Sequence, residues 1–466
     1  MKVLFSIDNL GQGYNTAVNP YMNKKGECRE ALNADFSEIG SLGRFPGYET
    51  YGSDMGTSAV SGLYDCKNIS GGTVFVAVHN QTIFYLSGGT WTASNITNLT
   101  ANKQAYLASH LDTFILVNGF DAPKKSSDGQ TWSSLGGSPP TAKYVLTFDN
   151  KVYMLNVSGH TSRMQWSSDG TTETWTPASD NTAGFQDVAT NIGVGDEITG
   201  GAVNNNSLIV FKNYSTWKWD TFSLVTLNTN VGCRAPRSIA TIDDKTFFLS
   251  HKGVMMTDGG KPIRISKQIS DFINGISDLT ACVGWSYDNY YYLYIGTSNG
   301  VTNCLLIYDY DLNVWSYKSM NDVVKVGAVL TSGDSSSQYG YFGNDNGQVY
   351  RFKTGNTDNG TAIPFKWKSA VETCNAPHLE KEFHRISIRL ESVAKPGIDV
   401  FYSVNFKDFK PLGTVWKSVH ELWFPKGTKG QNIRLMFSSN SSADQPNILG
   451  YTCMGEYMIG KLGDVE

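Results

Sequence analysis

The chain has 466 residues and a formal net charge of −4, and 17% of its residues are charged while 12% are aromatic. This near-neutral balance argues against a basic protein that coats nucleic acid. No run of eighteen apolar residues occurs, so no membrane span is expected. The seven cysteines form no C-x-x-C pair, which is typical of free thiols in a reducing cytoplasm.

The N-terminal stretch combines frequent turns with apolar side chains. Its first apolar run, in "MKVLFSIDNL", is too short for the core of a signal peptide. Within "SEIGSLGRFPGYETYG", Gly and Pro alternate with Ile39, Leu42, Phe45 and Tyr48. We predict that these four side chains insert into the neighbouring domains, while Arg44 and the Pro46-Gly47 turn fix the path of the chain. Residues 1–52 are therefore expected to form an extended segment that closes or anchors the next domain.

Strand–turn–strand units recur over the next three hundred residues. They begin near residues 71, 111, 149, 205, 243, 287 and 337, and an aromatic residue often follows an Asp-Gly or Asn-Gly turn. Propeller blades repeat at about 40 to 50 residues. The sequence therefore predicts an all-β protein with a six- or seven-bladed β-propeller over residues 53–353. A set of ordinary β-sandwiches is the alternative.

The pattern changes after the polar stretch "KTGNTDNGTAIP". Residues 364–466 contain at least six alternating apolar segments without the Asp-Gly punctuation of the repeats. Such a segment of about a hundred residues suits a β-sandwich-like C-terminal domain.

Two stretches resemble the Asp-box turn of sialidases and related propellers: "SSDGQTW" at 126–132 and "SSDGTTETW" at 167–175. In that turn the aspartate binds backbone amides and the tryptophan packs into the blade, so the box is structural. Sialidases need an arginine cluster for the substrate carboxylate and a Tyr/Glu nucleophile pair, but this chain has only ten Arg and no arginine motif of that family opens it, so sialidase activity is not the favoured interpretation.

Other chemical patterns are incomplete. "DYDLNVW" at 309–315 begins like a calcium loop but lacks the required Gly and Glu, so a turn between strands is predicted. Cys374, His378 and His384 would need further ligands to hold zinc. Trp217 and Trp219, on either side of Lys218, could stack on sugars or single-stranded nucleic acid, but strand packing is the favoured interpretation. We expect no catalytic residue, no metal and no cofactor.

Two motifs resemble tail and head-completion proteins of short-tailed bacteriophages. In that family a segment of the form N…GxLRxxPG leads into a β-propeller, and here Asn33, Gly40, Leu42, Arg44, Pro46 and Gly47 match it, with Gly43 inserted. The stretch "NAPHLEKEFHRISIRLES" is similar to the opening of the sandwich that often ends such proteins, through Pro377, Lys381, Phe383, Ile386 and Ile388.

The resemblance implies a tail hub, nozzle or packaged-DNA-stabilisation protein, not an enzyme. Such proteins form homo-oligomeric rings, commonly of six copies, below the portal and its adaptor. They contact other tail proteins, including fibres or spikes, and genomic DNA passes through them without sequence-specific binding. The expected location is the virion, after assembly in the cytoplasm of the host bacterium. The alternatives are a glycan-binding lectin or adhesin propeller and, further off, a sialidase-like glycoside hydrolase.

Overall fold

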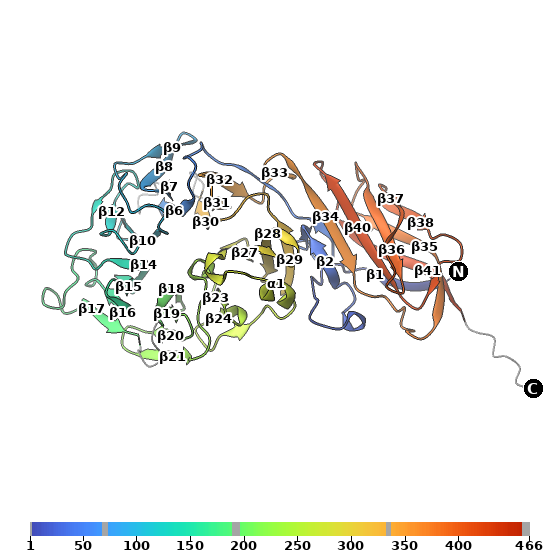
Figure 1. Ribbon diagram of the computed structural model, residues 1–466, viewed down its shortest axis with the longest axis horizontal. Helices are drawn as coiled ribbons and strands as arrows, with labels where there is room; N and C mark the ends of the chain where they lie inside the picture. The colour runs from blue at the N-terminus through green and yellow to red at the C-terminus, as the bar shows by residue number, and fades with distance from the viewer. Residues whose placement is uncertain (1, 68–72, 189–195, 332–336, 459–466) are drawn as a thin grey trace, which may run out of the picture.

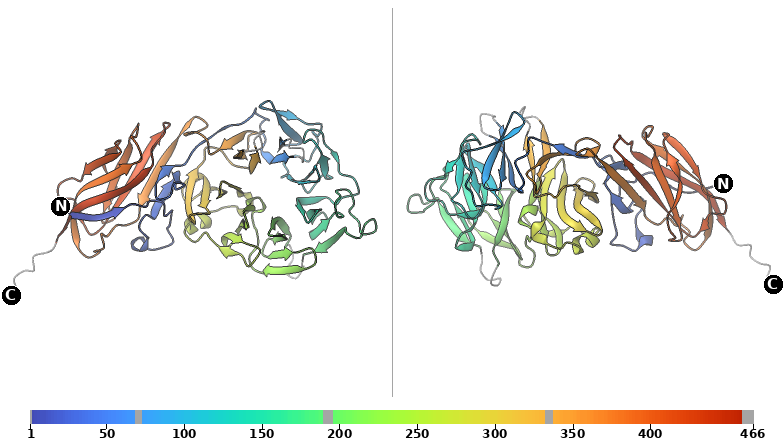
Figure 2. Two further views of the ribbon diagram at one scale, coloured as in Figure 1. Left: turned by 180° about the vertical axis from the view of Figure 1, so that it is seen from behind. Right: turned by 45° about the horizontal axis from the view of Figure 1, so that its top comes forward.

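The computed structural model describes residues 2–67, 73–188, 196–331 and 337–458. Its strands form two bodies that lie side by side along the long axis of the molecule, a ring of small sheets and a sandwich of two larger ones (Figure 1). Figure 2 shows the same division from behind and in a view tilted so that the top of the molecule comes forward. None of the described helices has the length and hydropathy needed to span a bilayer.

Over the described residues, the ring consists of seven four-stranded blades, which confirms the predicted propeller and its upper blade number. Blades 1 to 4, each from the inner strand outwards, are β6 (Val60–Lys67), β7 (Thr73–His79), β8 (Thr82–Ser87) and β9 (Thr90–Ala93); β10 (Tyr106–His110), β11 (Thr113–Val117), β12 (Lys124–Ser126) and β13 (Ser133–Ser134); β14 (Ala142–Phe148), β15 (Lys151–Val157), β16 (His160–Trp166) and β17 (Gly184–Asp187); β18 (Ile198–Asn204), β19 (Ser207–Lys212), β20 (Thr216–Trp219) and β21 (Leu224–Asn228).

Blades 5 to 7 have the same strand order. They are β22 (Ala240–Ile242), β23 (Lys245–Ser250), β24 (Gly253–Thr257) and β25 (Ile263–Arg264); β26 (Val283–Tyr287), β27 (Tyr290–Ser298), β28 (Val301–Asp309) and β29 (Val314–Ser319); β30 (Val326–Thr331), β31 (Gln338–Gly343), β32 (Val349–Phe352) and β5 (Tyr48–Thr50). The described helices are the short α1 (Ser270–Asn274) and three 3₁₀ turns, η1 (Pro20–Met22), η2 (Pro236–Ser238) and η3 (Leu279–Ala281).

The predicted units correspond to the two middle strands of each blade. Two-residue turns join several of these strands to the inner one, and their residues adopt positive φ, as at Asn205 and Asn206 or Asp288 and Asn289. Asn and Asp tolerate this conformation, which matches the twist of a hairpin. These turns therefore set the register of the inner strands.

The ring closes with a strand from the N-terminal region. In blade 7, β5 pairs antiparallel with β32, so that Tyr48 lies opposite Phe352 and Thr50 lies opposite Tyr350. The Val60 amide of blade 1 donates to the Asn344 carbonyl of blade 7 at 3.0 Å. The last blade is thus completed by residues that precede the first blade in the chain.

The second body is the predicted sandwich, but it also contains the start of the chain. One sheet has the order β1-β41-β35-β38 with β39 beside β35, and the other contains β2, β34, β40, β36 and β37. Residues 1–52 are therefore divided: β1 and β2 belong to the sandwich, and β5 belongs to the propeller. The bounds are β1 (Lys2–Ile7), β2 (Cys28–Leu32), β34 (Thr361–Ser369), β35 (Glu380–Leu390), β36 (Ile398–Val404), β37 (Lys410–Val415), β38 (Val419–Trp423), β39 (Lys429–Gly430), β40 (Ile433–Ser441) and β41 (Ile448–Met458).

Backbone pairing joins the two bodies. β2 lies between β29 of blade 6, where Leu32 faces Tyr317 in parallel, and β34 of the sandwich. The short β33 (Thr357–Asp358) links β34 to β5. One hydrogen-bonded sheet therefore runs from blade 6 through the sandwich to blade 7, and one apolar core cluster contains residues of both bodies.

Candidate functional site

Asn33 is the first residue of the N-terminal motif, and it bridges the two bodies. It is fully buried and has a φ of 54°, a conformation that Asn tolerates better than most residues. Its side-chain amide donates to the Pro364 carbonyl at 2.6 Å and accepts from the Ser319 amide at 2.9 Å. Asn33 thus binds the end of blade 6 and a strand of the sandwich with one side chain.

Leu42 and Arg44 extend this contact along the sandwich. Leu42 is buried, and its backbone pairs with that of Ile448. Arg44, in the short β4 (Gly43–Arg44) opposite β3 (Ala34–Asp35), donates to the carbonyls of Ser441 and Ala443, the latter at 2.7 Å. Burial lowers the pKa of Arg44.

The motif then enters the propeller. Phe45 is 1% exposed and packs on Tyr292 and Phe352. Pro46 lies with Arg44 on the wall of a cavity between the bodies, and the Gly47 amide donates to the Gly355 carbonyl at 3.0 Å. Phe45 therefore inserts into the propeller as predicted, but Pro46 and Gly47 form no turn and lead in an irregular segment into β5.

Gly40 and Ile39 lie in the turn that precedes Leu42. Gly40 has a φ of 85°, and its carbonyl accepts from the Leu10 amide at 3.0 Å. The prediction that Ile39 inserts into a domain is wrong, because this side chain is 81% exposed. The Ser41 amide and hydroxyl both bind the Glu38 carbonyl, and the resulting tight turn places Ile39 at its outside.

The C-terminal motif lies within the sandwich. Pro377 is exposed before β35, while Phe383 is buried and packs on Phe424. Lys381 is fully buried and donates to the carbonyls of Ala376 and Gln431, the latter at 2.6 Å. Burial lowers the pKa of Lys381. Lys381 and Phe383 thus hold the start of β35 within the sandwich.

A buried ion pair lies where the two bodies meet. Lys318 of β29 is 0% exposed, and its Nζ lies 2.8 Å and 2.9 Å from the carboxylate oxygens of Asp358 in β33. Burial lowers the pKa of Lys318 and raises that of Asp358, and their mutual attraction opposes both shifts. The Tyr48 ring of β5 lies 5.9 Å from the ammonium. No motif pointed to this pair.

The Asp-box stretches are structural turns. Asp128 accepts from the amides of Gln130 and Thr131, and the Trp132 indole donates to the Gly129 carbonyl. Trp132 and Trp175 are both buried. The first box lies between β12 and β13, the outer strands of blade 2, so it is far from the propeller axis.

The incomplete patterns also form ordinary structure. Residues 309–315 turn from β28 to β29, with the Asp309 carboxylate accepting from the Leu312 amide. Trp217 and Trp219 are buried in one core cluster. His384 lies 2.9 Å from Glu456. Within residues 2–67, 73–188, 196–331 and 337–458, no three His, Cys, Asp or Glu side chains lie close enough together to hold a metal ion.

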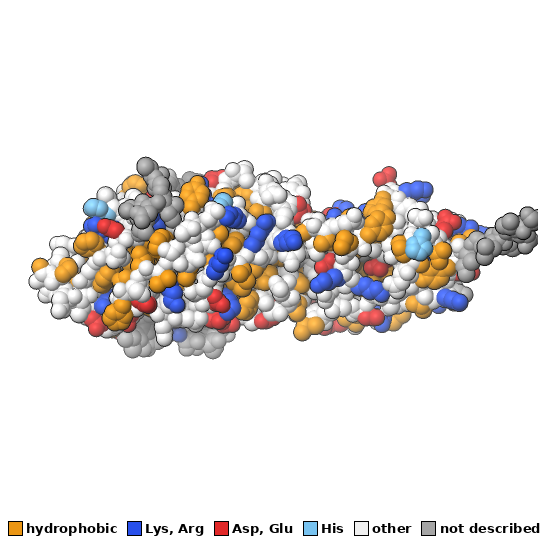
Figure 3. All heavy atoms as spheres, turned by 90° about the horizontal axis from the view of Figure 1, so that it is seen from below, with side chains coloured by type: hydrophobic (Ala, Val, Ile, Leu, Met, Phe, Trp, Pro, Cys, Tyr) orange, Lys and Arg blue, Asp and Glu red, His pale blue; other side chains and the backbone are white. Residues whose placement is uncertain are grey.

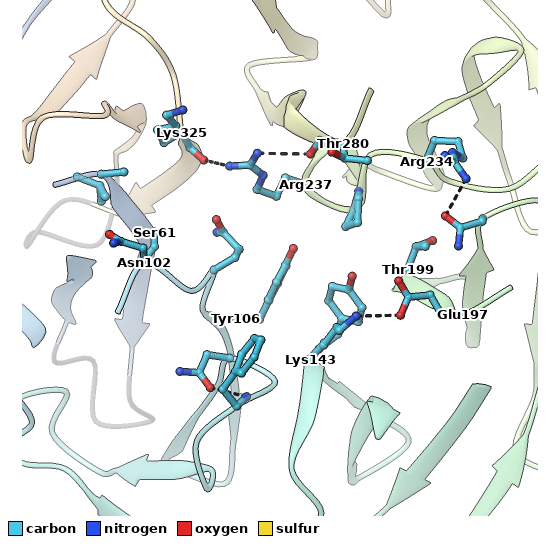
Figure 4. Close-up of a pocket in the computed structure, with 18 residues that line it drawn as sticks. Ser61, Asn102, Tyr106, Lys143, Glu197, Thr199, Arg234, Arg237, Thr280 and Lys325 are labelled. Atoms are coloured by element: carbon cyan, nitrogen blue, oxygen red, sulfur yellow. Dashed lines mark hydrogen bonds and ion pairs between the residues drawn. The ribbon is translucent and has the colours of Figure 1, made fainter. Parts of the chain in front are cut away.

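A cavity of 530 Å³ lies around the propeller axis, where the inner strands begin. Every blade contributes, mainly through the loop that leads to its inner strand or the first residues of that strand. Figure 4 shows Tyr106, Lys143, Arg237 and Lys325 around a common space. Sequence analysis missed this cavity because its residues are dispersed between Ala59 and Lys325 and form no local motif.

The wall of this cavity carries more positive than negative charge. Its charged residues are Lys143, Arg234, Arg237, Lys325 and Glu197. Glu197 accepts from Lys143 at 2.8 Å. Burial alone would raise the pKa of Glu197, but the hydrogen bonds from Lys143 and Asn156 outweigh it and lower the pKa. The single acid is therefore ionised and paired.

Glu372 gives the sandwich a pH dependence. It is 8% exposed, and burial raises its pKa to about 7 from an ordinary value of 4.5. Between pH 4.5 and 7 the unfolded chain loses this proton while the folded protein keeps it, so the free energy of unfolding falls as pH rises. We expect Glu372→Gln to be more stable than the wild type at pH 8, by at most about 3 kcal/mol, with little difference at pH 4.

Denaturant unfolding of both proteins at the two pH values measures this effect. Glu380→Gln, which removes an exposed carboxylate of the same domain, controls for the loss of one charge. Equal stability of wild type and Glu372→Gln at pH 8 would contradict the shift.

The strands and junction define the class of the protein: a seven-bladed β-propeller fused to a β-sandwich. No protein-family model and no curated protein matches the chain. Solved β-propeller structures resemble it. YCF48 from Cyanidioschyzon merolae aligns at 12% identity and a TM-score of 0.44, over 66% of this chain and 98% of its own. BamB from Moraxella catarrhalis aligns at 13% identity and a TM-score of 0.41, over 66% and 93%.

A third solved structure covers both bodies. The extracellular domain of the putative one component system BT4673 from B. thetaiotaomicron aligns at 10% identity and a TM-score of 0.43, over 94% of this chain and 64% of its own. At these values the similarities describe general architecture and carry no argument about activity.

Proposed function

We propose that this protein is a structural subunit of a ring-shaped conduit for genomic DNA, at the tail or head–tail junction of a short-tailed bacteriophage. The observation that carries the proposal is the junction between the two bodies. The motif that resembles the phage proteins supplies the residues that join propeller to sandwich, among them Asn33 and Arg44.

A closed ring requires subunits of fixed shape, because each copy repeats the same angle to its neighbour. The sheet that runs through both bodies supplies backbone hydrogen bonds across the junction. The shared core cluster and the Lys318–Asp358 pair add side-chain contacts there. A subunit built in this way has little freedom to hinge, which supports a mechanical role.

The surface charge is also compatible with a conduit. The chain carries a net charge of −4, and basic, acidic and apolar side chains are mixed on the face drawn in Figure 3. A channel without a continuous basic stripe lets a polyanion pass without holding it.

The test is the assembly state of the purified protein, measured by light scattering and negative-stain imaging, alone and with a portal–adaptor complex. We expect closed rings with a channel wide enough for duplex DNA, at least on the portal template. Monomers under both conditions would contradict the proposal. Glycan binding by such monomers, in a glycan-array screen, would favour the lectin alternative.

A further inference from the structure

We propose that the axial cavity of the propeller, lined by Lys143, Glu197, Arg234, Arg237 and Lys325, binds an extended acidic peptide segment of a partner protein. The inference goes beyond the proposed function and does not depend on it, because the cavity lies in one subunit.

The first argument is uncompensated charge. Lys143 is neutralised by Glu197, whereas Arg234, Arg237 and Lys325 form no ion pair with any described residue, and Arg237 has only the longer-range attraction of Asp278. All three line one half-buried space, and an anionic ligand bound there would be attracted by each of them.

The second argument is that the two guanidinium groups are held in place. Arg237 donates to three backbone carbonyls, those of Lys325, Thr280 and Ala281, at 2.9, 3.4 and 3.1 Å. Arg234 donates to the Asn213 side chain and lies 5.2 Å from the Tyr214 ring. Held cations lose little conformational entropy when a ligand binds, and a guanidinium matches the geometry of a carboxylate.

The third argument selects a peptide among acidic ligands. Gln104 and Asn102 lie on the wall, and side-chain amides can bind both groups of a peptide backbone. Single-stranded nucleic acid is held mainly by stacking of its bases on open aromatic faces. Tyr106 instead directs its hydroxyl end towards the middle of the cavity (Figure 4), and Lys103 lies 3.9 Å above the Phe120 ring.

The size of the cavity agrees with a short segment. Its volume of 530 Å³ falls within the range of about 300–1,000 Å³ that is usual for small-ligand sites. A folded domain does not enter such a space, so the ligand is a tail or loop in extended form.

The experiment measures fluorescence anisotropy of the labelled peptide GSEEEESG and its uncharged counterpart GSQQQQSG with the full-length protein. We expect the glutamate peptide to bind at least about tenfold more tightly, since hydrogen bonds in which donor and acceptor are charged are stronger than neutral ones. Lys325→Glu and Arg234→Gln should each weaken its binding by about tenfold or more. Arg237 is left unchanged because its carbonyl contacts are structural.

The matched control is Lys261→Glu, which changes an exposed lysine of blade 5 away from the cavity and should leave binding unchanged. Melting curves confirm that each variant is folded, and a second variant, Lys325→Gln, repeats the test without charge reversal. Equal binding of both peptides, no binding, or insensitivity to the cavity variants would overturn the proposal. Tighter binding of trigalacturonate or octathymidylate would also overturn it, in favour of a glycan or nucleic-acid site. None of these readouts depends on ring formation.

Discussion

Asp358→Ala is expected to destabilise the protein by about 3–5 kcal/mol, since it leaves the buried Lys318 ammonium without a counter-charge. Lys318 is 0% exposed, so water cannot replace the lost carboxylate without opening the junction. Denaturant unfolding at neutral pH measures the loss. Because both bodies contact the pair, the unfolding of the propeller and that of the sandwich should both shift.

The matched control replaces both partners. Lys318→Met with Asp358→Leu removes the pair without leaving a buried charge, and we expect it to recover most of the stability lost in Asp358→Ala. Glu421→Ala, which breaks the partly exposed pair with Arg385, should cost no more than about 1 kcal/mol. If Asp358→Ala also lost no more than about 1 kcal/mol of unfolding free energy, water at the junction would be solvating the Lys318 ammonium, contrary to the prediction.

The propeller could be predicted because the sequence features that specify each blade lie within one short segment of the chain. Each middle hairpin carries its own alternation and its own turn residues, as in β15 and β16 or β27 and β28. In β27, all six residues of the apolar run from Tyr290 to Ile295 are buried, as is typical of a strand covered on both faces.

The N-terminal strands could not be placed by the same reasoning. β1 pairs with β41 and β2 with β34, and their partners are hundreds of residues away in the chain. Pairing at such separation leaves no local pattern, because alternation shows that a segment is a strand but not which strand it joins. The boundary predicted between residues 52 and 53 was based on the Gly- and Pro-rich composition of the N-terminal stretch. Composition does not show which strands pair.

The two sites differ in what sequence could reveal. The motif indicated Asn33 and Arg44 at the junction but not the Lys318–Asp358 pair. It did not reveal the role of Asn33, because its hydrogen bonds with Pro364 and Ser319 join distant segments. The axial cavity had no motif at all. Its residues come from all seven blades and lie together only when the ring closes, so in the sequence Arg234 and Lys325 look like ordinary surface positions.

The two glycines of the N-terminal motif provide the second large effect. A Cβ at Gly47 would overlap the carbonyl group of Thr357, which belongs to the backbone of β33 and cannot rotate away. A Cβ at Gly40 would lie no closer than 3.8 Å to the Asp8 carbonyl, so only its φ of 85° opposes a side chain there. We therefore expect Gly47→Ala to cost about 3 kcal/mol or more and Gly40→Ala about 1 kcal/mol.

Amide hydrogen exchange shows whether this cost falls on ring closure. The Tyr51 amide, which donates to the Val349 carbonyl at 2.8 Å, reports on the pairing of the closing strand with blade 7. In Gly47→Ala this amide should exchange faster while the middle strands of blades 2 to 4 keep their protection, because the clash displaces β5 first. Gly40→Ala should leave it protected. Equal protection of the Tyr51 amide in both variants would contradict this expectation. It would mean that the close contact at Gly47 does not hold β5 in place, and that packing on blade 1 secures the seventh blade instead.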